Sequence, residues 1–421
     1  MSKQEINFQS VSNVLLHPDS QGTELKKWLN GNGGTGLEKA LSNPDKVIPA
    51  IREAGLRGMG GSGFPAYKKW QFVSVQQANP DKYLICNGNE DEPGTFKDAC
   101  LLSLTPNQVI EGALITALAN RINKIVFYIN PDQETSLANI RHAVGQWQAS
   151  DFFSRIEEKL ATQLSIQVME SSGHYVGGEE TAAIESVEGN FPFPRGKPPY
   201  PATAGVHGCP TLVNNVETLA NVSHILRNGA QWYQDLGIGE CSGTKIYCLS
   251  GDVVKPGVYE LPMGTPLTDL IYIHGGGMLL DKKLKAVFSG GASSSILTPE
   301  DIDVPLDFDS VHERGSSLGT GAMIVVSEGT GIVKRVTEYV NFYAHSSCGQ
   351  CPPCKTGTFY ISQLLNKINT GQASSVDLES LINLCKILPG SGRCHLLDGA
   401  VKIVDSSLLH FADEYKSSLK R

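Results

Sequence analysis

Four cysteines near the carboxyl end restrict the fold of this chain more than any other feature. Cys348, Cys351 and Cys354 follow one another at two-residue intervals in "SSCGQCPPCKTG", and Cys394 follows in "GSGRCHLL". The C-x2-C-x2-C spacing is typical of iron–sulfur ligation, whereas structural zinc favours two separated pairs of ligands. Because the flanking segments have a helical pattern, the sequence predicts a helical bundle around a metal centre. We expect a [4Fe-4S] cluster on all four thiolates, with zinc or unliganded thiols as alternatives.

Composition indicates a globular protein of two to three domains. The chain has 421 residues, 40% hydrophobic content and 44 glycines, which is enough for several cores and many tight turns. The formal net charge of −8 gives no reason to expect a nucleic-acid partner or binding to an anionic membrane surface.

The sequence shows no secretory signal and no membrane span. Its N-terminus, "MSKQEINFQSV", lacks a basic-then-apolar layout, and nowhere do 18 uncharged apolar residues follow one another. We therefore expect a cytoplasmic protein. In that reducing compartment ten cysteines do not indicate a disulfide framework, which again favours a metal site for the clustered ones.

An alternation of strand and helix patterns indicates an α/β domain. Short β-branched runs at 83–86, 124–130 and 164–170 alternate with helical patterns at 106–120 and 132–148. This order is typical of a largely parallel sheet covered by helices.

The flanking regions differ in character. Residues 1–50 carry no motif, and the glycine-rich stretch 30–36 is expected to be a flexible connector. The proline-rich stretch 189–210 is expected to be a rigid loop around a surface or a ligand, and 213–229 a helix. Strand-like pieces joined by Gly and Pro turns predict a small second domain from 244 to about 330, and the remainder is helical.

The segment "GLRGMGGSGFPAYKKW" contains a glycine-rich turn. Gly58, Gly60 and Gly63 match G-x-G-x-x-G, but the turn follows a helical pattern and precedes a strand, the reverse of a Rossmann fingerprint. Without Cβ atoms, its backbone N–H groups could still approach a phosphate, with Lys68 or Lys69 adding charge. An ordinary flexible loop is the alternative.

Two acidic clusters complete the candidate sites. One directly follows a predicted strand, where ligands of open α/β sheets bind, although a solvated turn would look the same. The other lies at a predicted helix start, where acidic residues are favoured in any case. The clusters consist of Glu90, Asp91, Glu92 and Asp98, and of Glu179 and Glu180.

Six motifs, taken in order, resemble one known family. They are "LRGMGGSGFPAYKKWQF", "NEDEPGTFKD", "YVGGEETAAIESVEG", "KPPYPATAGVHGCPTLVNNVETLAN", "LGTGAMIVV" and "SCGQCPPCKTGT…C". The chain resembles, from about residue 50 to about residue 400, the flavin-bearing, NADH-oxidising subunit of respiratory complex I. It is similar in the same way to the diaphorase subunits of NAD-dependent hydrogenases and formate dehydrogenases.

The resemblance implies a domain order and a set of binding residues. It implies an N-terminal extension at 1–50, a Rossmann-like flavin and NADH domain at 51–240, a ubiquitin-like β-grasp (SLBB) domain at 244–330 and an iron–sulfur helical bundle at 334–421. For the flavin and its phosphate it implies Gly58, Gly60, Gly61, Lys69, Asn87, Asn89, Glu90, Gly178, Glu179, Asn214, Asn215 and Thr218. For NADH it implies Phe64, Phe72, Glu92, Tyr175, Glu180, Lys197, Tyr200 and Thr320.

The chain departs from the family pattern near the flavin. Met59 stands where the family usually has Arg, Asn89 replaces an Asp, Gly177 a Cys, and Ala99 the Arg after "FKD". FMN is the implied cofactor, and FAD is the alternative. The "GMGG" turn also resembles the C subunit of Rnf-type complexes.

The resemblance implies that the protein brings electrons from NADH into a larger redox complex. NADH would pass a hydride to the flavin, and single electrons would leave through the [4Fe-4S] cluster to the iron–sulfur and catalytic subunits of a larger oxidoreductase, or would flow in reverse. Among enzymes, the alternative is an Rnf-like or other ferredoxin-coupled flavoprotein. Among non-enzymes, the alternative is a non-catalytic scaffold subunit stabilised by zinc. No side chain is expected to act as a nucleophile, because the protein orients and tunes the redox groups.

Overall fold

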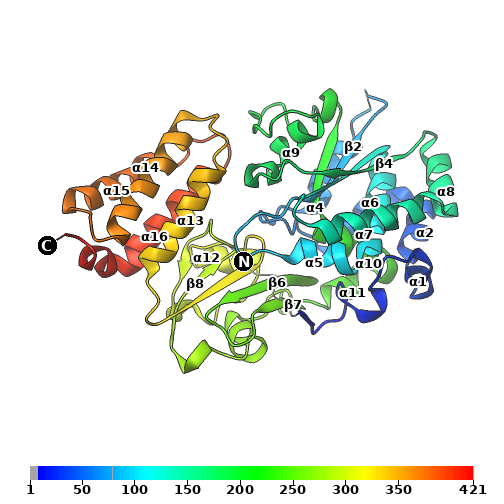
Figure 1. Cartoon of the computed structure of the whole chain (residues 1–421). Helices are drawn as coiled ribbons and strands as arrows, with labels where there is room; N and C mark the ends of the chain where they lie inside the picture. Colours follow the sequence, from blue (N-terminus) through cyan, green and yellow to red (C-terminus); the bar gives the residue numbers. More distant parts are fainter. Residues whose placement is uncertain (1–7, 78, 421) are drawn as a thin grey trace.

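Two sheets and a helical bundle make up the chain (Figure 1). The structure is a computed structural model that describes residues 8–77 and 79–420. The helix-covered four-stranded sheet and the C-terminal bundle lie on opposite sides of Figure 1, and the second sheet lies below and between them.

The first sheet is fully parallel, with strand order β4-β3-β2-β5. Its central strands are almost entirely apolar and buried, as expected for a parallel sheet with helices on both faces. The strands are β2 (Tyr83–Gly88), β3 (Lys124–Ile129), β4 (Ser165–Glu170) and β5 (Thr211–Asn215). The predicted strands at 83–86, 124–130 and 164–170 are confirmed.

Helices surround this sheet (Figure 1). They are α3 (Val47–Ala54), α4 (Ala66–Ser74), α5 (Lys97–Leu104), α6 (Pro106–Asn120), α7 (Glu134–Gln148), α8 (Asp151–Leu160), α9 (Glu180–Val187), α10 (Val216–Asn228) and α11 (Ala230–Gln234). The helices predicted at 106–120 and 132–148 are confirmed.

The helix expected over 213–229 begins later than predicted. Residues 213–215 belong to β5, which pairs with β2, and the Asn215 side chain then caps α10 by accepting a hydrogen bond from the Glu217 N–H. A short apolar run beside a helix has no local period that separates the two states, so pairing with a buried neighbour decides.

The second sheet is mixed and has the strand order β1-β7-β6-β10-β8-β9. Its strands are β1 (Phe8–Ser10), β6 (Thr244–Gly251), β7 (Gly257–Pro262), β8 (Leu284–Ser289), β9 (Ile296–Leu297) and β10 (Ala322–Ser327), accompanied by α12 (Phe308–Glu313). The edge strand β1 pairs in parallel with β7, although about 250 residues separate them.

The N-terminal segment packs into the same core as the α/β layer. The N–H groups of Leu15 and Leu16 donate to the Glu260 carboxylate at 2.8 and 2.9 Å, and α1 (Leu25–Asn30) and α2 (Thr35–Ser42) follow. The expected flexible connector at 30–36 is therefore wrong at both ends, since Asn30 ends α1 and Thr35 begins α2. A Cβ on Gly36 would lie 2.7 Å from the Ser223 carbonyl, so glycine allows α2 to approach α10.

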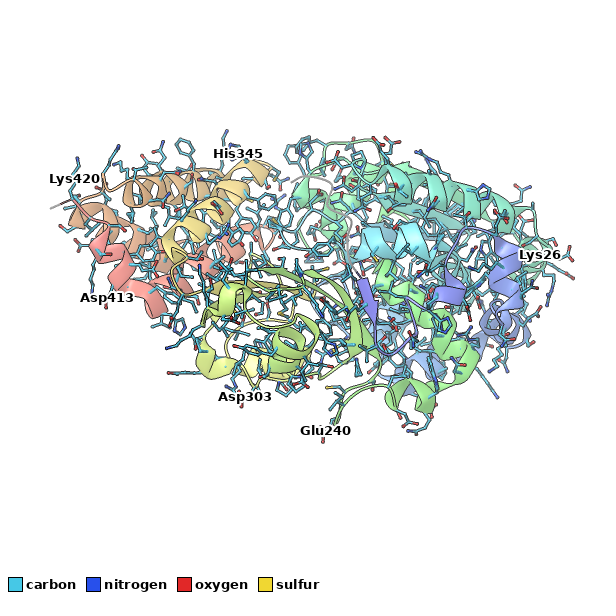
Figure 2. All side chains as sticks on the ribbon, turned by 60° about the horizontal axis from the view of Figure 1, so that its bottom comes forward. Lys26, Glu240, Asp303, His345, Asp413 and Lys420 are labelled. Atoms are coloured by element: carbon cyan, nitrogen blue, oxygen red, sulfur yellow. The ribbon has the colours of Figure 1, made fainter. Side chains whose placement is uncertain are left out.

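The C-terminal region is a four-helix bundle, as predicted. Its helices are α13 (Ile332–Ser346), α14 (Pro352–Asn369), α15 (Ser375–Ile387) and α16 (Leu396–Ser417). Figure 2 labels Asp413 and Lys420 at the outer end of the bundle and Lys26 at the opposite end of the molecule.

Alternate residues of β10 connect the bundle to the rest of the protein. Met323 and Val325 belong to the buried cluster that continues into the α/β layer, whereas Ile324 and Val326 belong to the cluster that continues into the bundle. Because successive strand side chains point to opposite faces, the second sheet is covered on both sides. This sheet therefore fixes the bundle relative to the four-stranded sheet.

Candidate functional site

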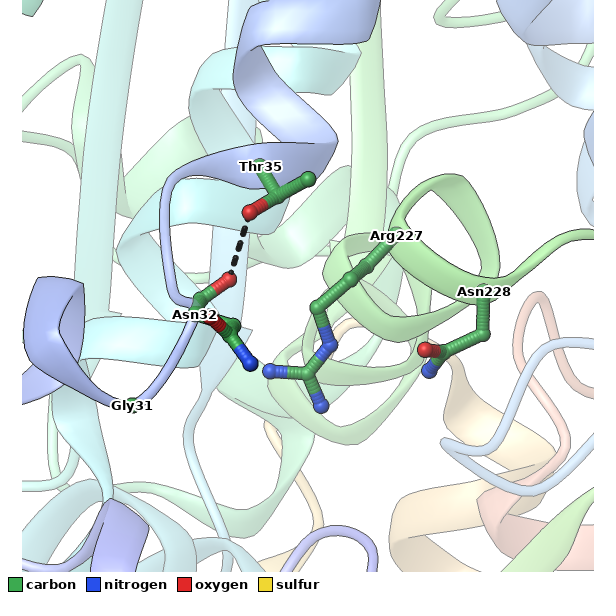
Figure 3. Close-up of a pocket in the computed structure, with 5 residues that line it drawn as sticks. All are labelled: Gly31, Asn32, Thr35, Arg227 and Asn228. Carbon is green, nitrogen blue, oxygen red and sulfur yellow. Dashed lines mark hydrogen bonds between the residues drawn. The ribbon is translucent and has the colours of Figure 1, made fainter.

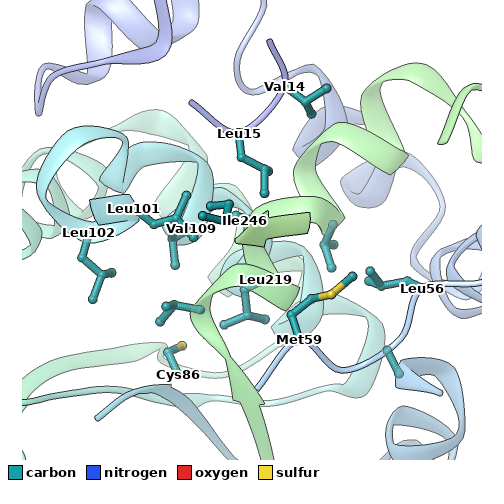
Figure 4. Close-up of a cluster of buried hydrophobic side chains, with 14 of the residues drawn as sticks. Val14, Leu15, Leu56, Met59, Cys86, Leu101, Leu102, Val109, Leu219 and Ile246 are labelled. Carbon is teal, nitrogen blue, oxygen red and sulfur yellow. The ribbon is translucent and has the colours of Figure 1, made fainter. Parts of the chain in front are cut away.

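The glycine-rich turn lies between α3 and α4, so its predicted non-Rossmann context is confirmed. The Gly58 N–H donates to the Phe64 carbonyl at 2.8 Å and closes the turn, and the Met59 N–H donates to the Thr218 hydroxyl at 2.9 Å. Figure 4 shows Met59 among buried side chains that include Leu56 and Leu219. Met59, where the resemblance implies an arginine, is thus a buried core residue.

The open side of the turn is shaped for close approach of a ligand. Gly61 has a φ of +135°, and a Cβ built on it would meet no atom within 4 Å. Gly60 has little room, because a Cβ there would lie 3.0 Å from the Asn215 side chain. Gly61 also bridges to Gly319, which places the neighbouring Thr320 beside the turn. Bare backbone facing open space is what binding a flavin phosphate or ring requires.

Asparagines gather at the carboxyl ends of β2 and β5. The register sets Cys86 opposite Asn214 and Asn87 opposite Asn215. The Asn215 side chain donates to the Asn87 carbonyl at 3.1 Å, and the Asn87 side chain donates to the Gly178 carbonyl at 2.9 Å. Asn89 follows β2 and shares a hydrogen bond with Ser171. The structure therefore brings these predicted flavin residues to one sheet edge.

A network of buried charged side chains is hydrogen-bonded to this sheet edge. The Glu217 carboxylate lies 3.0 Å from the Lys97 ammonium and 3.2 Å from that of Lys245, and Lys97 also pairs with Asp98 at 2.6 Å. Lys97, Glu217 and Lys245 are at most 1% exposed. Burial alone would raise the pKa of Glu217, but the two lysines outweigh burial and lower it.

Lys97, Glu217 and Lys245 are absent from the sequence-based site. Lys97 and Glu217 lie inside two of the quoted motifs, and Lys245 is a charge within the apolar run "TKIYCL", but none of these signals reveals the partner. The network reaches the predicted flavin residues, since Lys97 donates to Asn215 at 3.1 Å. Lys245 also approaches the Met59 carbonyl at 3.4 Å.

Glu90 binds the first turn of α5. Its carboxylate accepts the N–H groups of Asp98 and Ala99 at 2.9 and 3.0 Å. Desolvation and the nearby Asp98 raise the pKa of Glu90 to about 8, against the opposing effect of Lys97.

Glu180 joins two lysines at the start of α9. Its carboxylate lies 2.7 Å from the Lys69 ammonium and 2.5 Å from that of Lys197. Burial raises the pKa of Glu180, but the charges and hydrogen bonds of the two lysines outweigh it and bring the pKa to about 2. The structure thus pairs the predicted flavin-phosphate lysine with a predicted NADH contact. The neighbouring Glu179 caps α9 by accepting the N–H groups of Thr181 and Ala182.

Three aromatic residues predicted to contact NADH are exposed. Phe64 is 39% exposed, Phe72 56% and Tyr200 59%. Exposed aromatic faces of this kind can stack on a purine ring. Tyr175, by contrast, points inward and donates a hydrogen bond to Glu92.

The four predicted cluster ligands surround one small cavity. Cys348 follows α13, Cys351 precedes α14, Cys354 lies in the first turn of α14 and Cys394 precedes α16. The cavity is also lined by Pro194, Gln350, Gly392 and Arg393. All four thiols are free of disulfides. Between residues 8 and 420, with residue 78 left aside, no three His, Cys, Asp or Glu side chains are placed to hold a single metal ion.

This donor set fits an iron–sulfur cluster. A cubane takes one thiolate at each of four corners, so its ligands surround a volume and do not converge on a point. Burial raises the pKa of the Cys394 thiol to about 11 and also raises that of Cys354, so bound iron would have to displace these protons.

The proline-rich loop connects the cysteine cavity to the nucleotide side. Of the loop predicted over 189–210, residues 190–205 form no helix or strand, but the short 3-10 helix Val206–Gly208 lies inside the predicted bounds and corrects them. Arg195 fixes the loop by pairing with Glu185 and Glu188, each at 2.6 Å. Pro194 lines the cysteine cavity, and Lys197, three residues further on, binds Glu180.

A larger open cavity lies elsewhere. About 390 Å³ in volume, it is lined by Gly31, Asn32, Thr35, Arg227 and Asn228, and Figure 3 shows the Arg227 guanidinium directed towards Asn32. None of the predicted site residues lines it, so its size does not identify the functional site. Within the described residues, no helix is both long and apolar enough to cross a membrane.

Comparisons with known proteins agree with this arrangement. Three family models match: the Nuo51 FMN-binding domain over residues 51–224, the SLBB domain over 246–296, and the NADH-ubiquinone oxidoreductase-F iron–sulfur binding region over 334–418. These matches confirm the predicted FMN and [4Fe-4S] cofactors and the β-grasp domain.

Relatives of known name cover nearly the whole chain. The second NADH-quinone oxidoreductase F subunit of Rhizobium meliloti is 39% identical over 401 residues, covering 95% of each chain. The corresponding F subunit of Escherichia coli is 36% identical over 409 residues, covering 96% of this chain and 92% of its own. The crystal structure of an NAD+-reducing [NiFe]-hydrogenase in the H2-reduced state superposes with a TM-score of 0.84 at 34% identity, over 95% of this chain and 68% of that chain.

Fold and site together define an NADH-linked iron–sulfur flavoprotein. Within that class, the chain belongs to the family of the NADH-quinone oxidoreductase F subunit. The predicted resemblance is therefore confirmed.

Proposed function

We propose that this chain takes electrons from NADH at an FMN bound beside the glycine-rich turn and delivers them, through a [4Fe-4S] cluster on its four clustered cysteines, to partner subunits of a larger oxidoreductase. The observation that carries the proposal is the loop 190–205, which lines the cysteine cavity through Pro194 and reaches the Glu180 ion cluster through Lys197. One short segment thus borders both the iron–sulfur and the nucleotide side.

The flavin side rests on the fit of backbone and amides. The bare face of Gly61 leaves room for a phosphate or ring edge to approach the backbone. Asn87, Asn214 and Asn215 lie at the strand ends beside it, where hydrogen bonds from the Asn87 and Asn215 amides to backbone carbonyls hold two of them in place. Lys69 would supply the positive charge for the phosphate and would then share it with Glu180. When bound, FMN supplies two-electron exchange with NADH and one-electron exchange with a [4Fe-4S] centre.

The NADH side rests on rings and fixed charges. Phe64, Phe72 and Tyr200 present exposed aromatic faces, on which an adenine can stack with little desolvation cost. The Glu180 carboxylate stays ionised far below neutral pH and can accept hydrogen bonds from ribose hydroxyls, while it orients Lys197. These groups orient the nucleotide and do not react with it.

Electron flow in the opposite direction is the second candidate. The chain superposes on an NAD+-reducing [NiFe]-hydrogenase with a TM-score of 0.84. A chain that reduces NAD+ with electrons from a partner would use the same residues, because binding and orientation of the nucleotide are required in both directions.

The test is a spectrum of protein prepared anaerobically with iron, sulfide and FMN. Flavin absorption that bleaches on addition of NADH, together with acid-labile sulfide, would support the proposal. Mass measurement of the cofactor released by denaturation would separate FMN from FAD. A protein that retains neither flavin colour nor acid-labile sulfide would refute the proposal. Such a result would favour the non-catalytic, zinc-binding scaffold.

A further inference from the structure

The Glu92 carboxylate lies where the three parts of the chain meet. Glu92 follows β2, and one of its oxygens accepts a hydrogen bond from the Tyr175 hydroxyl of the same α/β layer. Its other oxygen accepts the Ala292 N–H at 2.9 Å, from the segment after β8 in the second sheet. That oxygen also accepts the Tyr343 hydroxyl at 3.2 Å, from α13 of the bundle. One half-buried carboxyl group therefore takes a donor from each part.

The surroundings of this contact are closely packed. The Tyr175 ring meets the rings of Phe342 and Tyr343 with centroids 5.2 and 5.8 Å apart, and Tyr343 has no exposed surface. Gly291 has a φ of +98°, and a Cβ there would come within 2.6 Å of the Glu92 side chain. Any other residue at 291 would therefore force the Glu92 side chain or the backbone at 291 to move.

The three donors matter because the carboxyl group is largely withdrawn from water. Burial raises the pKa of Glu92, and the hydroxyls of Tyr175 and Tyr343 act in the opposite direction. A buried charge without hydrogen-bond partners is costly, so each donor that is lost weakens the junction.

Tyr343 lies close in sequence to the cluster cysteines, and its partner Glu92 lies close to the flavin site. Tyr343 is five residues before Cys348, and α13 ends at Ser346. Glu92 lies two residues after Glu90, in the loop at the strand end where the predicted flavin residues gather. The hydrogen bond thus joins the helix that leads into the cysteine cavity to the edge of the flavin site.

We propose that Tyr343 is a positioning residue, which acts through Glu92 to fix α13 and the cysteine cavity relative to the flavin site. The inference rests on the proposed function, in which one electron at a time leaves the reduced flavin and reduces the cluster. Tyr343 itself neither gains nor loses electrons, and it does not touch the nucleotide.

The first test uses the chain without cofactors. Tyr343→Phe removes one hydroxyl and keeps the ring. Tyr339→Phe makes the same change one turn earlier on α13, where the ring packs against Phe288. By hydrogen–deuterium exchange, amides of residues 89–96 and 290–294 should exchange about tenfold faster in Tyr343→Phe, as expected for the loss of a hydrogen bond to a charged group. Tyr339→Phe should match the parent. Equal protection in all three proteins would overturn the proposal.

The second test uses the loaded protein and separates two rates by stopped flow. Flavin bleaching by NADH should slow far less than cluster reduction in Tyr343→Phe, because the substitution removes none of the predicted NADH contacts. Cluster reduction should be about tenfold slower, since small displacements of reacting groups are costly. If both rates fall together, or neither changes, the positioning role is wrong.

A second variant approaches the same contact from its other side. Glu92→Gln keeps the volume and removes the carboxylate. It replaces Tyr343→Phe in the hydrogen–deuterium exchange test alone, should that variant not fold, because Glu92 is also a predicted NADH contact. If Tyr343 acts through Glu92, the two substitutions remove the same contact. In the double variant, which combines Tyr343→Phe with Glu92→Gln, the amides of residues 89–96 and 290–294 should then exchange no faster than in the more affected single variant. A parent that NADH does not bleach would refute the proposed function. A working parent whose Tyr343 and Glu92 variants behave like it would refute only this inference.

Discussion

Replacing Glu217 with Gln tests the buried charge network that supports the flavin edge. In the protein the Glu217 carboxylate accepts hydrogen bonds from the ammonium groups of Lys97 and Lys245 and from the Ile246 N–H. Lys97 keeps Asp98 as a partner in the variant. Lys245 is 0% exposed. In the variant it would keep the Met59 carbonyl at 3.4 Å as a hydrogen-bond partner but would lose the Glu217 carboxylate.

Two estimates of the cost agree. Removing one partner of a buried ion pair typically destabilises a protein by about 3–5 kcal/mol. The stranded Lys245 can also lose its proton, at about 1.36 kcal/mol for each pH unit below its unperturbed pKa of about 10.4. At pH 7 that limits the penalty to about 4.6 kcal/mol. For a unit of about 200 residues, such a loss lowers the Tm by roughly 10 °C.

Thermal unfolding followed by calorimetry measures this loss. Glu38→Gln is the matched control, because Glu38 makes the same kind of pair with Arg155 at the surface, where both side chains are nearly half exposed. The control should unfold close to the parent, since exposed pairs contribute little. If Glu217→Gln also unfolds within about 1 °C of the parent, a difference well below 1 kcal/mol, the network is not a stabilising element and the reasoning fails.

The pH dependence and a second substitution sharpen the test. In Glu217→Gln the folded-state pKa of Lys245 falls further below its unfolded value, so the unfolded chain binds more protons between the two pKa values. Stability then rises with pH in that interval, and the deficit should shrink as pH approaches about 10. Adding Lys245→Met should recover most of the lost Tm, because no buried charge is left alone. A double variant as unstable as the single one would contradict this account.

Three further substitutions test the site residues. Cys351→Ser should abolish the cluster signal in electron paramagnetic resonance yet leave flavin bleaching by NADH intact; an unchanged signal would remove Cys351 from the ligand set. Lys69→Ala should weaken FMN binding about tenfold, the effect expected for one charge-assisted hydrogen bond, and fluorescence titration of the apoprotein would show it. Glu180→Gln should raise the Kd for NADH before it lowers flavin content. With its pKa of about 2, the Glu180 carboxylate stabilises the fold fully above its unfolded pKa of about 4 and loses this effect as pH falls towards 2.

Local patterns predicted the elements whose causes are local. The helix at 106–120 has the predicted bounds because a proline begins it and an apolar period continues through it. The cysteine spacing predicted ligands that do surround one cavity, since three of them lie within seven residues. The strand Thr211–Asn215 was missed, because a five-residue apolar run beside a helix carries no period of its own.

Contacts between distant residues account for the rest of the site. Glu217 and Lys245 meet across 28 residues and Glu217 and Lys97 across 120, and no local pattern shows that such charges will be buried together. Lys69 was assigned to a phosphate by position, and its ion pair with Glu180, 111 residues away, became visible only in the fold. No local pattern in the sequence singles out Tyr343, because its partner Glu92 lies 251 residues earlier.

The amino-acid sequence alone determined the family, the order of its domains and the chemistry of its cofactors. Those depend on residue types at short, fixed spacings, which a chain displays whatever its path. Only the tertiary structure decided which charges are buried together, how the N-terminal strand Phe8–Ser10 joins the second sheet, and where the bundle meets the flavin edge. These features arise when chain segments hundreds of residues apart exclude water between them, and the free energy of that burial belongs to the pair and to neither segment alone.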